Sequence, residues 1–174
     1  MIALTIYKNA FPILEYDDEK DGVIIPNRNG KVLLPEICVL TFFREVLEDF
    51  VTKHKSEIRH NYRSEMANFP IYVLDYKGIE LCLMQAVVGS ASIAMMMDYL
   101  ISYGVKKIIA CGACGVLVDI PTGDVIIPVK ALRDEGASYH YLPPSRDIDL
   151  NVEMISMIKK TLNDNNVPYL ECKT

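Results

Sequence analysis

The stretch KKIIACGACGVLVDIPTGDVIIP, residues 106–128, decides the fold of this chain. It starts with a short apolar run, passes through a segment rich in glycine and proline, and ends in a second apolar run. Short apolar runs bounded by turn residues are typical of strands that are buried on both faces of a sheet. The stretch therefore predicts two strands, with a glycine-rich loop at the carboxyl end of the first.

Strands and helices alternate on both sides of this stretch. The predicted elements are, in order, a strand at 36–42, a helix at 43–54, two strands within 71–88 joined by a turn at 75–78, a helix at 90–104, strands at 105–111 and 122–132, a helix at 149–166 and a strand at 167–172. Ser90 and Asp149 are good N-cap residues, so we expect them to begin the two later helices. The alternation predicts an α/β protein, a three-layer sandwich around a mostly parallel mixed sheet. We expect one domain over residues 1–174, incomplete at its C-terminus because no helix follows the last strand.

The composition favours small molecules or other proteins as partners over nucleic acid. Hydrophobic residues make up 51% of the 174 positions, enough for a sizeable core, and the net charge of -5 argues against a nucleic-acid-binding protein. No apolar run approaches the roughly 18 residues that a membrane helix needs. The first twenty residues lack the basic start and the cleavage site of a signal peptide. Five cysteines, an odd number and mostly within apolar runs, favour a reducing compartment, so we expect a cytoplasmic protein without membrane or nucleic-acid partners.

Two cysteines of the opening stretch, Cys111 and Cys114, have the spacing of a redox dithiol. Such a motif needs a thiolate of lowered pKa, which the N-terminus of a helix usually supplies. A glycine-rich loop follows here instead of a helix, so we expect buried structural thiols. His54, His60 and His140 do not have the spacing of zinc ligands, so no metal site is expected.

The glycines of the stretch point to a ligand at the strand ends. Gly112 and Gly115 follow the predicted strand at 105–111, and Gly89 ends an earlier strand and precedes a helix. Open α/β sheets bind ligands outside the carboxyl ends of their strands, and a helix N-terminus favours an anion. The alternative interpretation, that these glycines only make tight turns, is equally compatible with the residue types.

A third polar segment, RDEGASYHYLP at residues 133–143, carries Arg133, Asp134, Glu135 and His140. These side chains could be catalytic. Because no partner arrangement is visible in the sequence, a hydrogen-bonded structural network is the favoured interpretation.

The order of these pieces resembles a known family. Residues 79–144, with the runs GVKKIIACGACG, TGDVIIP and RDEGASYH, resemble the nucleoside phosphorylases of the purine nucleoside and uridine phosphorylase family. The resemblance implies phosphorolysis of a purine or pyrimidine nucleoside to free base and ribose 1-phosphate, with inorganic phosphate as co-substrate and no cofactor. It also implies a homo-oligomer, a dimer or a trimer of dimers. The residues that it assigns are Arg44, Gly89, Gly112 and Ala113 to phosphate, and Val88, Cys114 and Gly115 to the nucleoside.

The chain departs from the family pattern at its phosphate ligands. Ala110 stands where the family has an arginine, Ala113 stands where it has serine or threonine, and the first strand ends in LTFFR instead of a glycine loop. The catalytic residues of the family lie downstream of the last strand, so none is expected in this chain. A hydrolytic nucleosidase and a non-catalytic nucleoside-binding or oligomerisation module are therefore alternatives to phosphorolysis.

Overall fold

The computed structural model describes residues 8–16, 22 and 24–174. Most of the stretch from which a signal peptide was excluded, residues 1–7 and 17–20, lies outside the described residues. The chain forms two compact units, one of residues 20–114 and one of residues 1–19 with 115–174. We call them the five-stranded unit and the three-stranded unit and describe each by itself, so a single domain over the whole chain stays a prediction.

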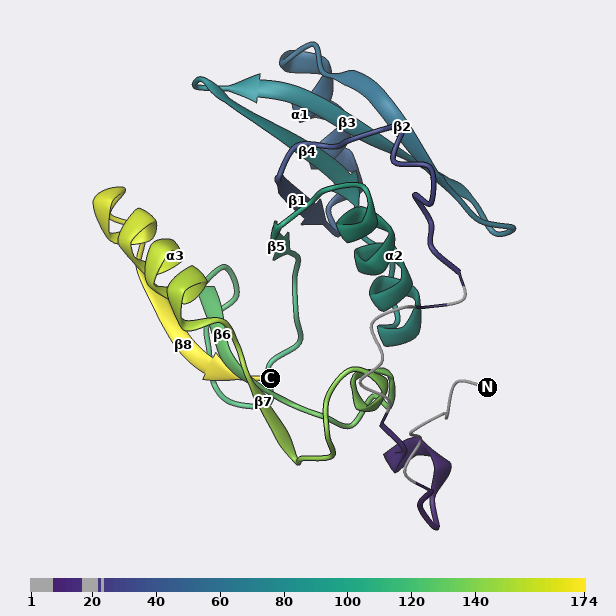
Figure 1. Ribbon diagram of the computed structural model, residues 1–174. Helices are drawn as coiled ribbons and strands as arrows, with labels where there is room; N and C mark the ends of the chain where they lie inside the picture. Colours follow the sequence, from purple (N-terminus) through teal and green to yellow (C-terminus); the bar gives the residue numbers. More distant parts are fainter. Residues whose placement is uncertain (1–7, 17–21, 23) are drawn as a thin grey trace. The chain divides into compact units, whose positions relative to one another are not determined.

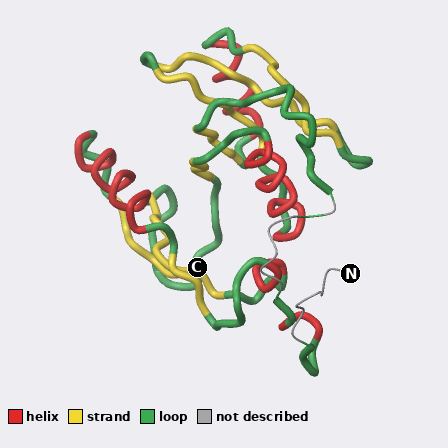
Figure 2. The backbone as a smooth tube through the Cα atoms, in the orientation of Figure 1, coloured by secondary structure: helices red, strands yellow, loops and turns green. Residues whose placement is uncertain are grey.

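The five-stranded unit is a mixed sheet with two long helices (Figure 1). Its elements are β1 (Ile37–Thr41), α1 (Arg44–Lys53), β2 (Glu57–Arg63), β3 (Asn68–Tyr76), β4 (Ile79–Gln85), α2 (Ser90–Ser102) and β5 (Lys107–Cys111). The strand order is β2-β3-β4-β1-β5. β4, β1 and β5 pair in parallel, whereas β2, β3 and β4 are antiparallel, and Figure 2 shows β3 and β4 as a long hairpin.

Each face of this sheet is covered by one helix. Successive residues of a strand point to opposite faces, and here Leu83 packs against α1 while its neighbours Cys82 and Met84 pack against α2. Leu47 and Val51 of α1 form the core on one face, together with Leu74 and Leu83. The core on the other face contains Met96 and Leu100 of α2, both fully buried. The three-layer α/β arrangement predicted from the sequence is confirmed in this unit.

The three-stranded unit contains a sheet whose middle strand is β6 (Val125–Leu132). β6 pairs in parallel with β8 (Tyr169–Lys173) and antiparallel with β7 (Asp147–Asp149). Its other elements are α3 (Val152–Asp164) and the short 3-10 helices η1 (Pro12–Leu14) and η2 (Ala137–His140). Among the described residues of the chain, no helix is long and apolar enough to cross a membrane.

Three details of the sequence prediction are wrong. β2 was not expected, because its sequence EIRHNYR is polar; it is an edge strand whose residues are exposed or half-buried. Asp149 does not begin a helix but ends β7, and the Oδ1 of Asn151 caps α3 by accepting a hydrogen bond from the Met154 amide at 2.9 Å. Ser90 is the first residue of α2, and Gly89 is its N-cap.

The expected burial of the thiols is correct for only some of them. Cys38 and Cys82 lie directly opposite each other on β1 and β4 and are fully buried. The hydrogen bond between the two thiols and the burial of Cys38 raise the pKa of Cys38 far above its ordinary value. Cys111 and Cys114, by contrast, are exposed, because they lie at and beyond the end of β5, where the core no longer reaches.

Candidate functional site

Three parallel strands end side by side at one edge of the five-stranded sheet. β1 lies between β4 and β5, and hydrogen bonds continue the ladder past the strand ends. The Ala86 amide donates to the Thr41 carbonyl oxygen at 2.8 Å, and the Phe42 amide donates to the Cys111 carbonyl oxygen at 2.9 Å. The segments that begin at Phe42, Ala86 and Gly112 therefore leave the sheet next to one another. We call this edge the strand-end site.

The residue that sequence reasoning missed at this site is Phe42. A Cβ built on Gly112 would lie 2.8 Å from Cδ2 of Phe42, which is closer than real Cβ atoms approach. Gly112 thus lets the Phe42 side chain pack directly on the backbone of the loop that follows β5. Phe42 remains 41% exposed. The run LTFF at the end of a strand was a signal for an aromatic contact here, but only the structure brings it onto the glycine loop.

Val88 and Gly89 occupy the segment between β4 and α2. Val88 is 88% exposed, and Gly89 has a φ of 113°, a conformation that residues with a side chain rarely adopt. The Gly89 carbonyl oxygen accepts a hydrogen bond from the Ile93 amide at 2.9 Å and so closes the first turn of α2. This strand end and that of β5 thus lie at the same edge of the sheet, with β1 between them.

Arg44 is the one predicted phosphate ligand with a charged side chain. Its Nε lies 2.8 Å from Oε1 of Glu48, one turn further along α1, and its side chain is 71% exposed. The hydrogen bond to Glu48 and the attraction of the Glu48 carboxylate raise the pKa of Arg44 above its ordinary value. The guanidinium is therefore held by an ion pair on the surface of α1, and its binding of phosphate stays a prediction.

The remaining predicted residues follow Gly112 in the chain. Ala113 and Cys114 are exposed in the loop after β5, and Gly115, also exposed, begins the three-stranded unit. The structure thus places Gly112, Ala113 and Cys114 consecutively at the strand-end site. Their roles toward phosphate and nucleoside, and that of Gly115, stay predictions.

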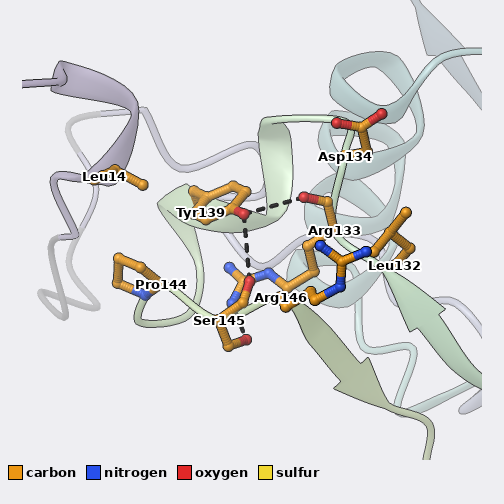
Figure 3. A pocket seen from close by; sticks show the side chains of 8 residues that line it. All are labelled: Leu14, Leu132, Arg133, Asp134, Tyr139, Pro144, Ser145 and Arg146. Atoms are coloured by element: carbon orange, nitrogen blue, oxygen red, sulfur yellow. Dashed lines mark hydrogen bonds between the residues drawn. The ribbon is translucent and has the colours of Figure 1, made fainter.

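The polar segment at residues 133–143 forms a loop around one buried arginine. Arg133 is 5% exposed and its guanidinium lies 4.3 Å from the centroid of the Tyr139 ring. Its nitrogens donate five hydrogen bonds of 2.6–3.0 Å, to Oγ of Ser138, Oγ of Ser145 and the carbonyl oxygens of Ser138, Leu142 and Pro143. The Tyr139 hydroxyl adds bonds to the carbonyl oxygens of Arg133 and Ser145 (Figure 3). The expected structural network is confirmed for Arg133.

Glu135 belongs to the same loop. Burial alone would raise its pKa, but hydrogen bonds from the Ser138 hydroxyl and from the amides of Ser138 and Ala137 outweigh burial and hold the pKa below its ordinary value. Glu135 thus acts as a hydrogen-bond acceptor for the start of η2. His140, at the end of η2, is exposed.

A cavity of about 650 Å³ opens beside this loop. It is lined by Leu14, Leu132, Arg133, Asp134, Tyr139, Pro144, Ser145 and Arg146 (Figure 3). Arg133 faces this cavity with donors that are already engaged within the protein. Its guanidinium therefore serves the loop as a structural hub.

The relation to known proteins agrees with this arrangement. The family model described as the phosphorylase superfamily matches residues 36–173. The chain belongs to the phosphorylase superfamily. No curated protein sequence matches it.

Solved structures of several nucleoside-related proteins have a similar fold. Uridine phosphorylase from Vibrio fischeri is 20% identical with a TM-score of 0.70, over 81% of this chain and 58% of that chain. Purine nucleoside phosphorylase from Toxoplasma gondii is 13% identical with a TM-score of 0.69, over 80% and 56%. Helicobacter pylori MTAN is 17% identical with a TM-score of 0.61, over 79% and 64%. The chain thus spans between 56% and 64% of the length of these three proteins.

Proposed function

We propose that the strand-end site binds a nucleoside and that the chain is part of an enzyme that cleaves the bond between base and ribose. The observation that supports the proposal most strongly is the meeting of β4, β1 and β5 at one edge, with an exposed glycine loop after β5 and an exposed Val88 and Gly89 after β4. Ligands of open α/β sheets bind at such edges. Membership of the phosphorylase superfamily, together with the uridine and purine nucleoside phosphorylases among the similar structures, supports a nucleoside as the ligand.

Phosphorolysis is the reaction that the resemblance implies, and hydrolysis is the second candidate. Phosphate needs cationic or hydrogen-bonding ligands, and charge-assisted contacts from arginine are the strongest of these. Two of the family's phosphate ligands are replaced by Ala110 and Ala113, and the guanidinium of Arg44 is paired with Glu48. The two alanines favour hydrolysis, or nucleoside binding without turnover, over phosphorolysis.

The experiment has a binding arm and a turnover arm. Calorimetric titration with inosine, adenosine and uridine measures binding, and chromatography of released base, with and without phosphate, measures the reaction. Base released only with phosphate indicates phosphorolysis, base released in water alone indicates hydrolysis, and binding without release indicates a non-catalytic module. If none of the three nucleosides binds saturably, the proposed function is wrong.

A matched pair of variants locates the binding site. Val88→Asp puts a charge at the strand-end site, where Val88 is 88% exposed, and should weaken nucleoside binding. Ile79→Asp puts the same charge at the amino end of β4, where Ile79 is 53% exposed, and should leave binding unchanged. Equal effects of the two substitutions would contradict binding at the strand ends.

A further inference from the structure

Two arginines that line the cavity beside the 133–143 loop lie opposite each other. The register of β6 and β7, in which Leu132 pairs with Asp147, continues for one more step, because the Arg133 amide donates a hydrogen bond to the Arg146 carbonyl oxygen at 2.9 Å. Side chains directly opposite each other in an antiparallel ladder are neighbours, and like charges at such positions are destabilising. Both residues line the cavity of about 650 Å³. Two positive charges are therefore close together at this cavity.

Neither arginine has an ion-pair partner in the part of the chain that the structure describes. The Arg133 guanidinium, although buried, donates only to hydroxyl and carbonyl oxygens. Asp147, next to Arg146 in the chain, is ion-paired with Lys173. Glu135 accepts hydrogen bonds from the start of η2. Because a buried cation without a counter-ion is costly, an anion in the cavity would stabilise this pair.

The two arginines offer a ligand different things. All five N–H groups of the Arg133 guanidinium are donated within the loop, so Arg133 contributes only its charge. Arg146 is exposed, and its guanidinium donates no hydrogen bond to the described residues. A guanidinium with free N–H groups binds a carboxylate or a phosphate through two parallel hydrogen bonds. Arg146 is therefore the group that would contact an anion directly.

The rest of the cavity is mostly apolar. Three apolar side chains line it, those of Leu14, Leu132 and Pro144. The hydroxyls of Tyr139 and Ser145 are bonded to backbone carbonyl oxygens of the same loop. Asp134 also lines the cavity, but Figure 3 shows its carboxylate apart from Ser145 and from the Tyr139 ring. Apolar walls favour a ligand with an apolar part, and the Asp134 carboxylate disfavours a ligand with several negative charges.

We propose that this cavity binds a small organic anion, a carboxylate or a phosphate ester that carries an apolar group, with Arg146 as its hydrogen-bond donor. The site belongs to the three-stranded unit and is built from other residues than the strand-end site. The inference therefore does not depend on the proposed function. The anion neutralises the two facing arginines, and its apolar group covers the apolar walls.

Benzoate and phenyl phosphate are the probes, and benzyl alcohol is their uncharged counterpart. In titrations of the wild-type protein followed by ligand-observed NMR, at least one of the two anions should bind saturably and about tenfold more tightly than benzyl alcohol. The anion that binds more tightly identifies the preferred oxyanion. Sodium chloride at roughly 0.5 M should weaken its binding severalfold, because salt screens the charges of the arginines. If neither anion binds saturably, or if benzyl alcohol binds as tightly, the inference is wrong.

Two substitutions with opposite expected effects locate the site. Arg146→Met removes the donor and should weaken binding of the preferred anion at least about fivefold, whereas Asp134→Asn removes a like charge and should strengthen it about twofold or more. Arg63→Met makes the same change at an exposed arginine of the five-stranded unit and should alter the Kd less than about twofold. Thermal unfolding checks that every variant is folded. Equal losses for Arg146→Met and Arg63→Met, or an unchanged Kd for Arg146→Met, would overturn the inference.

Discussion

Replacement of Arg133 should be the most damaging single change in the three-stranded unit. Arg133 as a whole residue is 5% exposed. Its guanidinium donates five hydrogen bonds to the loop between β6 and β7. A hydrogen bond to a charged group is worth about 1.5–3 kcal/mol, but the desolvation of the guanidinium offsets several kcal/mol of the sum. The net loss for Arg133→Met should therefore be about 3–5 kcal/mol, a large part of the 5–15 kcal/mol that typical domains have.

The assay is urea unfolding followed by far-UV circular dichroism, with chymotrypsin as a local probe. Tyr139, Tyr141 and Leu142 lie in the loop that Arg133 holds, so cleavage there should accelerate in the variant. Arg133→Lys keeps the charge but loses the fork of donors, and should give an intermediate loss if Arg133→Met does not fold. Arg146→Met is the control, because Arg146 is exposed on the same loop and should change stability by less than about 0.5 kcal/mol. A loss below about 1 kcal/mol for Arg133→Met would refute the role of a structural hub.

Three further substitutions test individual contacts. Gly112→Ala should lower stability by about 1–3 kcal/mol in urea unfolding, because its methyl group would lie 2.8 Å from the Phe42 ring, whereas Gly115→Ala, with open space around it, should have little effect. An equal loss at both glycines would contradict the close packing. Asn151→Ala should cost about 1 kcal/mol through loss of the α3 cap, measured in the same way, and Asn151→Asp should restore it. Glu135→Gln should flatten the stability profile on its acid side, below about pH 4.5. The folded pKa of Glu135 lies below its ordinary 4.5, so its contribution is present above that pH and is lost as the pH falls through the folded pKa; an unchanged profile would contradict this.

The sequence predicted the buried elements because burial leaves a pattern. The apolar runs of β1 and β5, and the turn Asp75–Gly78 between β3 and β4, correspond to what the structure contains. β2 was missed because an edge strand has few side chains in the core and its sequence reads as polar. The caps of α2 and α3 were misplaced by one or two residues, since Ser90 and Asp149 are as suitable for capping as the residues that do it.

The sequence predicted where the candidate site lies but not the side-chain contacts within it. Gly89 and Gly112 placed it at the strand ends, because glycine after a strand permits a turn or a close approach. Two features needed the structure: the ion pair that holds Arg44 on α1, and the contact of Phe42 with Gly112. Both depend on side-chain direction, which spacing along a sequence does not determine. The exposure of Cys111 and Cys114 was misjudged because these residues lie at and beyond the end of β5, where the core no longer reaches.

The position of β1 between β4 and β5 has a consequence for the order of folding. Both of its neighbours come later in the chain, since Cys38 pairs with Cys82 and Ile37 with Lys107. The hairpin of β3 and β4 needs only a short turn, and local pairings of this kind form before distant ones. We therefore expect β2, β3 and β4 to form first during synthesis. The apolar segment ICVLT of β1 remains unpaired until then. The most buried strand of the sheet is thus the one that a chaperone, or an aggregating second chain, would meet on the nascent protein.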